Sequence, residues 1–120
     1  MSDYKDLEVW RKSHDMLLDI YKITSKYPKE EIYGLVSQIR RAAVSIPTNI
    51  AEGNGRLHQK EYINFLSISR GSAMEVEYLL LVSKDLEYID DNKFQQLNRK
   101  CKSIIHMLNK LINYLKSKTY

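Results

Sequence analysis

Apolar residues recur at steps of three and four along nearly the whole chain, which is the spacing of one face of an α-helix. Four such segments, at about residues 7–27, 30–52, 59–88 and 93–115, are separated by short polar stretches. Short connections place consecutive helices antiparallel. The pattern therefore predicts the fold class, which is all-α: an up-down antiparallel four-helix bundle in a single domain of residues 1–120.

The second segment contains one helix-breaking residue and a helix end. Pro47 lacks a backbone donor, so we expect this helix to be kinked at Pro47 or to start its last turn anew. Gly53 and Gly55 follow the last apolar residues of the segment. Because glycine adopts the left-handed conformation of a helix C-cap without strain, these two residues predict where the helix ends.

The first segment has two apolar lines. The main line contains Leu7, Trp10, His14, Leu17, Leu18 and Tyr21. The second line contains Val9, Met16, Ile20, Ile23 and Tyr27. A helix with two apolar faces normally packs against two partners, here its own bundle and another subunit. His14 is interpreted as a hydrogen-bonded histidine of the core.

The third segment is apolar on all sides from Tyr78 to Val82, unlike a helix with one exposed face. A monomer would expose this surface and one line of the first segment as a large apolar patch. We therefore predict a homo-oligomer. The candidate interface residues are Val9, Met16, Ile20, Ile23, Met74, Tyr78 and Leu81.

A line of polar residues runs beside the apolar face of the second segment, also at helical spacing. Amide, guanidinium, hydroxyl and carboxylate groups in one line indicate a hydrogen-bonded seam that is at least partly buried. We expect Glu52 or Glu75 to pair with Arg41 or Arg70, in a structural role rather than as an acid–base pair. The seam residues are Gln38, Arg41, Ser45, Asn49, Glu52, Arg70 and Glu75.

The composition is that of an ordinary folded domain, with 43% hydrophobic and 28% charged residues, which excludes a disordered chain. A single cysteine, Cys101, cannot form an intrachain disulfide. The first ten residues hold no apolar stretch typical of a signal peptide, and no apolar run approaches the length of a membrane span. We therefore expect a soluble, cytoplasmic protein without a membrane partner.

Positive charge is concentrated at one end of the sequence. Residues 1–91 carry a net charge of −3, whereas residues 92–120 hold seven basic and no acidic residues, which gives +4 overall. A basic surface attracts phosphate, so RNA or DNA is the predicted ligand. No aromatic platform for stacking bases is evident, so we expect little sequence specificity. The candidate nucleic-acid-binding residues are Arg40, Arg56, Lys60, Arg99, Lys100, Lys102 and Lys110.

No motif for catalysis, a metal or a cofactor is present in the sequence. Of the histidines at 14, 58 and 106, only His58 has a ligand-type residue at helical spacing, Glu61, which is too few for a metal site, and the Glu-x-x-His pairs of di-iron bundles are absent. The run from Gly53 to Arg56 lacks the strand and the Lys-Ser/Thr pair of a phosphate-binding loop. Cys101 is interpreted as a small buried apolar residue. We expect no enzymatic activity.

Three segments carry a family resemblance: LEVWRKSHDMLLDIY, EIYGLVSQIRRAAVSIPTNIAEGNGR and FLSISRGSAMEVEYLL. They resemble the four-helix bundle proteins encoded in intervening sequences of bacterial 23S rRNA genes, and are similar to accessory proteins of diversity-generating retroelements. The resemblance implies a cytoplasmic, non-enzymatic bundle that forms five-membered rings. In some relatives, a strongly positive surface binds nucleic acid and a reverse transcriptase.

Two functions remain open at this point. The first is an oligomeric bundle, most simply a pentamer, that binds RNA or DNA through basic surfaces. The second is an oligomeric scaffold that holds a protein partner, such as a reverse transcriptase, without functional contact with nucleic acid.

Overall fold

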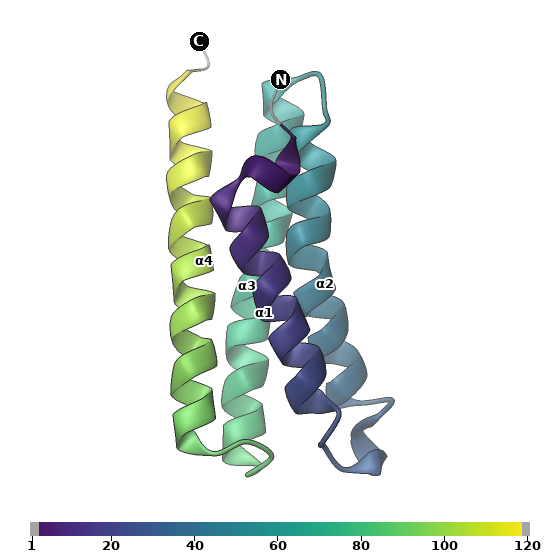
Figure 1. Cartoon of the computed structure of the whole chain (residues 1–120). Helices are drawn as coiled ribbons and strands as arrows, with labels where there is room; N and C mark the ends of the chain where they lie inside the picture. Colours follow the sequence, from purple (N-terminus) through teal and green to yellow (C-terminus); the bar gives the residue numbers. More distant parts are fainter. Residues whose placement is uncertain (1–2, 119–120) are drawn as a thin grey trace.

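The computed structural model describes residues 3–118, and its four long helices confirm the predicted all-α fold class (Figure 1). The helices are α1 (Glu8–Thr24), α2 (Leu35–Asn54), α3 (Gln59–Asp85) and α4 (Asp91–Ser117). Two short 3-10 helices, η1 (Tyr4–Asp6) and η2 (Lys29–Glu31), precede α1 and α2.

The helices alternate in direction and form an elongated bundle of 49 × 23 × 20 Å. Each helix packs beside its neighbours in the sequence, and α1 closes the bundle against α4. Both ends of the described chain lie at the end of the bundle that also carries the α2–α3 connection (Figure 1). All four helices contribute to the core. Its fully buried side chains include Met16, Ile20, Ile39, Ile46, Ile50, Leu66, Leu80, Ile104 and Leu108.

Helices α2 and α3 approach closely because small residues line their contact. The Ser69 hydroxyl donates a 2.8 Å hydrogen bond to the backbone oxygen of Ile46 across the interface. A Cβ atom at Gly53 would lie only 2.8 Å from Cβ of Phe65 and 2.9 Å from Cδ1 of Tyr62. Gly53 is therefore required by the close approach of α3.

The left-handed cap predicted at the end of α2 is wrong. No glycine among residues 3–118 has a positive φ, and Gly55 has a φ of −87°. The helix continues through Pro47 to Asn54, so the proline does not divide it. Pro47 is buried, and the oxygen of the preceding Ile46 accepts the hydrogen bond from Ser69 of α3.

The two faces of α1 are exchanged relative to the prediction. Its buried residues are Val9, Ser13, Met16, Ile20 and Thr24, whereas Leu18, Tyr21 and His14 are exposed. Ser13 and Thr24 face the core because each hydroxyl donates to a backbone oxygen one turn earlier, at 2.7 Å in both cases. A buried hydroxyl that is satisfied in this way has little cost. These two polar residues hide the core face from a search for apolar periodicity.

The α3–α4 turn contains a positive φ at Glu87, of 66°. The Tyr88 N–H donates to the oxygen of Ser83 and the Glu87 N–H to that of Lys84, both at 2.9 Å. This pattern is a Schellman motif, which usually places glycine at the left-handed position. It ends α3 at Asp85, three residues earlier than expected, and the Asp90 carboxylate then caps α4 by accepting from the Lys93 N–H.

Candidate nucleic-acid interface

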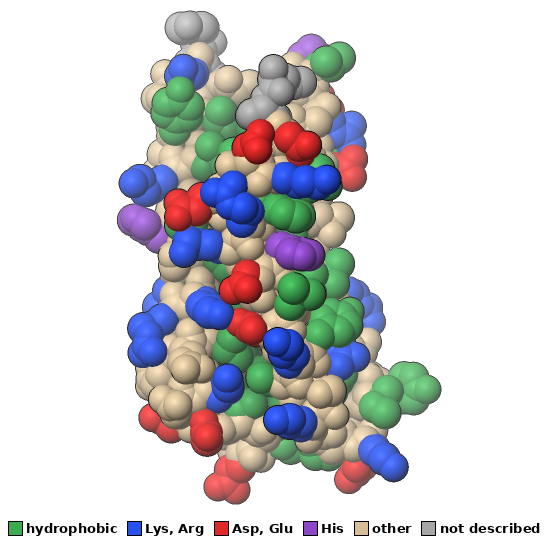
Figure 2. Space-filling model, in the orientation of Figure 1, with side chains coloured by type: hydrophobic (Ala, Val, Ile, Leu, Met, Phe, Trp, Pro, Cys, Tyr) green, Lys and Arg blue, Asp and Glu red, His purple; other side chains and the backbone are tan. Residues whose placement is uncertain are grey.

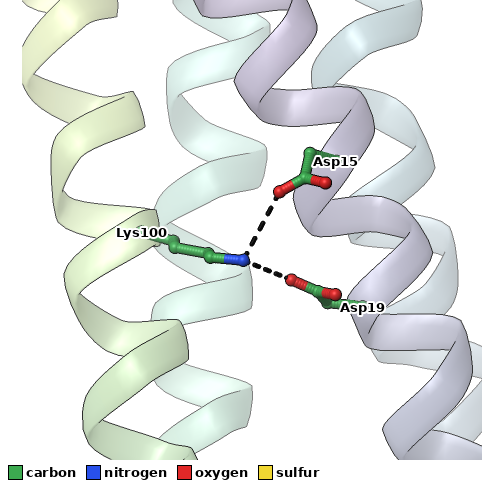
Figure 3. Close-up of polar contacts among 3 residues, drawn as sticks. All are labelled: Asp15, Asp19 and Lys100. Carbon is green, nitrogen blue, oxygen red and sulfur yellow. Dashed lines mark hydrogen bonds and ion pairs between the residues drawn. The ribbon is translucent and has the colours of Figure 1, made fainter.

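The basic side chains of α4 differ in how far they are neutralised. Lys100 reaches across to α1, where its Nζ lies 2.5 Å from Oδ2 of Asp19 and 3.4 Å from Oδ2 of Asp15 (Figure 3). The hydrogen bond that Lys100 donates to Asp19 is the main reason that the pKa of Lys100 is raised. Lys100 therefore holds α1 against α4 and is not a free cation.

Lys102 is paired on the other side of α4. Its Nζ lies 2.7 Å from Oε2 of Glu77 on α3, and that hydrogen bond raises the pKa of Lys102. Although α4 has no acidic residue beyond its first turn, the bundle brings acidic side chains from α1 and α3 beside it. Figure 2 shows Lys and Arg side chains spread over the face formed by α1 and α4, with Asp and Glu among them.

Arg99 and Lys110 remain as unpaired cations on α4. Both are exposed and make no hydrogen bond or ion pair within residues 3–118. They lie eleven residues apart, about three helical turns, and so project from the same side of the helix. These two residues are the part of the predicted α4 surface that is available to an external anion.

The three candidates outside α4 have different environments. Lys60 is exposed near the start of α3 without a partner in the described chain. Arg56 lies 3.2 Å from Glu52 and 4.0 Å from Glu61, so its charge is largely compensated. Arg40 is half-buried, and its contacts with α1 are described below.

The predicted polar seam is present only in fragments, and its charged members are exposed. Arg41 donates to Ser37 at 3.0 Å, Glu52 pairs with Arg56, and Arg70 donates to Asn109 at 2.9 Å. The expected pairing of Glu52 or Glu75 with Arg41 or Arg70 is therefore wrong. The sequence spacing correctly placed the seam residues of α2 beside its apolar face. In the structure that side of α2 faces solvent, so the charged residues on it are not buried.

Two fragments of the seam do join α2 to α3. The Gln38 amide donates to Oε2 of Glu75 at 3.3 Å. The Ser72 hydroxyl donates to Oγ of Ser45 at 2.8 Å, and Ser45 also accepts from the Asn49 amide at 2.9 Å. The serine contact is partly buried and the Gln38–Glu75 contact is exposed, and both join α2 to α3.

The candidate interface residues separate into two groups. Val9, Met16 and Ile20 are at most 5% exposed within a single chain, so they belong to the core and cannot contact another subunit. Their prediction as interface residues is wrong, because the second apolar line of α1 is its core face. Ile23 is partly buried against the core. Met74, Tyr78 and Leu81 remain exposed and form an outward apolar row on α3, which we call the α3 ridge.

A groove between α1 and α2 was not predicted from the sequence. Its volume is about 1060 Å³, and it runs beside the C-terminal part of α1, the following connection and α2 as far as Asn49. Tyr21 and Tyr33 lie on its rim with Arg40 and Arg41. Apolar periodicity could not predict this groove, because it placed Tyr21 on the main apolar line of the first segment and because Tyr33 lies in a turn. Both tyrosines are accessible, and Tyr33 is 96% exposed.

The histidines, the cysteine and the acidic residues of the described chain lie as follows. Residues 3–118 contain no group of three or more His, Cys, Asp and Glu side chains that could hold a metal ion. Burial raises the pKa of the Cys101 thiol to about 12, and the thiol donates to the backbone oxygen of Ala73. The interpretation of His14 as a core residue is wrong, since His14 is exposed and stacks on Trp10 with ring centroids 5.0 Å apart. Within the same residues, no helix has the length and apolar character needed to cross a membrane.

Comparison with known proteins identifies a family and a similar solved structure. The family model of the 23S rRNA-intervening sequence protein matches residues 5–110. A crystal structure from Bacteroides thetaiotaomicron VPI-5482, described as a protein of unknown function from the S23 ribosomal protein family, is similar with a TM-score of 0.79 and 28% sequence identity. The similarity covers 87% of this chain and 97% of that one. No curated protein matches the sequence.

Proposed function

The chain belongs to the family of 23S rRNA-intervening sequence proteins, and from that premise we propose that it is a non-enzymatic, oligomeric bundle of the cytoplasm that binds RNA or DNA through basic side chains. The observation that carries the proposal is the pair of unpaired cations, Arg99 and Lys110, on α4, which has no acidic residue beyond its first turn. In an oligomer this pair is repeated on each subunit, so several weak phosphate contacts add together.

The α3 ridge supports the oligomeric part of the proposal. Met74, Tyr78 and Leu81 are 54%, 63% and 39% exposed and lie on consecutive turns of one helix. Such a row of large apolar side chains is typical of a contact surface. We expect a pentamer, as the family resemblance implies, and light scattering measures the mass directly.

A paired substitution tests the ridge. Tyr78→Ser with Leu81→Ser should lower the mass of the assembly, because it removes two apolar side chains from the contact. Tyr114→Ser on α4 is a matched control, since Tyr114 is 53% exposed and lies outside the ridge. A wild-type protein that is a clean monomer at micromolar concentration contradicts the proposal.

Nucleic-acid binding is tested by salt titration with labelled single-stranded RNA and duplex DNA. Each phosphate contact contributes about 0.7 to the logarithmic salt slope on single strands and about 0.9 on a duplex. Arg99→Gln with Lys110→Gln should therefore weaken binding to all sequences alike and flatten the slope on single strands by about 1.4 for each subunit that the strand contacts. Lys22→Gln with Lys84→Gln removes the same charge elsewhere and should leave the slope unchanged.

The alternative function is a scaffold for a protein partner, such as a reverse transcriptase. The α3 ridge also favours this function, since an exposed apolar row is suited to either a second copy or another protein. The titration separates the two functions. If the wild-type protein binds neither nucleic acid at low salt, the scaffold replaces the nucleic-acid-binding protein.

A further inference from the structure

We infer that the groove between α1 and α2 binds an unpaired nucleic-acid strand, with bases stacked on Tyr33 and Tyr21 and phosphates held by Arg40 and Arg41. The inference rests on the proposed function, because it names the form of nucleic acid that the protein takes and a second place where it binds. It moves the main contact away from α4.

The size and shape of the groove are suited to a flexible strand. Its volume of about 1060 Å³ exceeds that of a single nucleotide, and it is open to solvent along α2. Ser25 after the end of α1 and Ser37 and Thr48 on α2 place hydroxyl groups along the walls. Hydroxyls can donate to phosphate and accept from base amino groups.

The charge of the groove is of one sign. Lys29, Arg40 and Arg41 line it, and no Asp or Glu does. This contrasts with α4, where acidic side chains of α1 and α3 compensate Lys100 and Lys102. The groove is therefore better suited to a polyanion than the surface predicted from the sequence.

The guanidinium groups are held in place and still have free donors. Arg40 donates through Nε to Thr24 Oγ1 at 2.8 Å and through Nη2 to the Tyr21 backbone oxygen at 3.3 Å. Arg41 donates once, to Ser37. Since a guanidinium has five N–H donors, both residues retain donors for phosphate oxygens. The contacts with α1 reduce the conformational entropy that Arg40 would lose on binding.

The two tyrosines supply flat apolar faces next to this charge. The Arg40 guanidinium carbon lies 4.4 Å from the centroid of the Tyr21 ring, so a cation and an aromatic ring already stack at the rim. Tyr33 is 96% exposed in the turn before α2. Aromatic rings beside guanidinium groups are the combination by which proteins bind single strands with little sequence preference.

A local cap explains why Tyr33 projects outward. The Glu31 side chain folds back over Gly34, and its Oε1 accepts a 3.1 Å hydrogen bond from the Leu35 N–H. A Cβ atom at position 34 would lie 2.9 Å from that oxygen, so glycine leaves room for the cap. The cap fixes the backbone of the turn that carries Tyr33, and the turn leaves the Tyr33 side chain 96% exposed.

An unpaired strand fits these features better than a duplex does. The bases of a duplex are stacked within the helix and present only their edges in the grooves. Tyrosine rings therefore cannot stack on the faces of duplex bases. A protein helix is the other occupant that a groove of this kind can take. Three cations and no carboxylate in the lining favour the strand.

The experiment compares three labelled probes by fluorescence anisotropy: a single-stranded oligouridylate, an abasic oligomer of the same length, and a duplex. The oligouridylate should bind most tightly, since only it offers both phosphates and free bases. Tyr33→Ala should weaken its binding about tenfold by removing one stacked base, and should leave the abasic oligomer unaffected. Tyr33→Phe should retain the affinity.

Two further variants separate the contributions. Arg41→Gln should weaken the oligouridylate and the abasic oligomer alike and lower the single-strand salt slope by about 0.7. Tyr114→Ala is the matched control, because Tyr114 is an exposed tyrosine of α4 with the Lys118 ammonium 4.8 Å from its ring centroid. It should bind as the wild type does.

The outcomes distinguish this inference from the proposed function. If Arg99→Gln with Lys110→Gln weakens binding but Tyr33→Ala does not, the proposed function stands and the groove site is wrong. If the abasic oligomer binds as tightly as the oligouridylate, base stacking is wrong. If Tyr33→Ala changes the mass of the assembly and leaves every affinity unchanged, another copy of the chain occupies the groove and the inference fails. If no probe binds the wild type, both proposals fail.

Discussion

The Tyr88 hydroxyl donates a 2.8 Å hydrogen bond to Oε2 of Glu31, and so joins the α3–α4 turn to the start of α2. The second oxygen of the same carboxylate caps α2 through the Leu35 N–H. One side chain thus fixes two connections at the same end of the bundle. The ring of Tyr88 also packs on that of Tyr27, with centroids 5.1 Å apart.

This arrangement predicts a specific acid sensitivity. The hydrogen bond from the Leu35 N–H, followed by that from Tyr88, holds the pKa of Glu31 below its ordinary value. A lowered folded-state pKa contributes stability above the pKa of the unfolded carboxyl, and this contribution is lost as the pH falls through the folded pKa. The loss therefore falls below about pH 4.

Glu31→Gln should be less stable than the wild type at neutral pH and should lose less of its remaining stability in acid. Urea unfolding at several pH values measures the effect. Glu30→Gln is the control, since the neighbouring Glu30 accepts no hydrogen bond in the described chain. Equal acid sensitivity of wild type and Glu31→Gln would refute the assignment.

Two glycines predict opposite effects of the same substitution. Gly53→Ala would place a Cβ atom 2.8 Å from Cβ of Phe65, which cannot move without its backbone. We expect a loss of about 1–3 kcal/mol in the free energy of unfolding as α2 and α3 are forced apart. Gly71 lies inside α3 with no atom within 4 Å of such a Cβ, so Gly71→Ala should gain about 1 kcal/mol from helix propensity. Thermal melts of the two variants give the signs directly.

The turn after α3 predicts a stabilising change. Glu87 has a φ of 66°, which costs about 1 kcal/mol for a residue with a side chain. Glu87→Gly should therefore raise the melting temperature, because glycine adopts this conformation freely. Glu87→Ala removes the same carboxylate but retains the strain, and should show no such gain. If both variants melt alike, the conformation at this position is not strained.

The contact between α1 and α4 predicts a salt-dependent stability. Lys100→Gln removes the bridge to Asp15 and Asp19, and we expect it to lower the free energy of unfolding by less than about 1 kcal/mol, because all three side chains are partly exposed. The difference from the wild type should shrink in molar salt. Arg99→Gln, one residue earlier and unpaired, should have no effect in either condition. A deficit of Lys100→Gln that persists at high salt would show that packing, rather than charge, is lost.

The fold could be predicted from the sequence because the apolar residues keep helical spacing along all four segments, even where a proline or a buried polar residue interrupts the pattern. Four apolar faces and short connections leave few arrangements other than an antiparallel bundle. The choice of face within α1 was not predictable in the same way. Ser13 and Thr24 look polar in the sequence, but each bonds to its own helix and can be buried.

The candidate site was less predictable, because charges are compensated by residues distant in the sequence. Lys100 is 81 residues from Asp19 in the sequence. Their pairing depends on how α1 packs against α4. Spacing along one helix reports which basic residues share a face but not what lies opposite them. No sequence pattern indicated that Tyr33 belongs to a binding site, because its exposure depends on the cap that Glu31 makes around Gly34.

The up-down order of the helices has a practical consequence for engineering. An even number of antiparallel helices brings both ends of the described chain to the same end of the bundle (Figure 1). A short flexible peptide can therefore fuse one copy to the next. The effective concentration of one fused copy around the other is then in the millimolar range. A tandem gene can then carry an altered α3 ridge or Tyr33 in one chosen copy, so that the number of intact surfaces needed for assembly or for nucleic-acid binding can be counted one at a time.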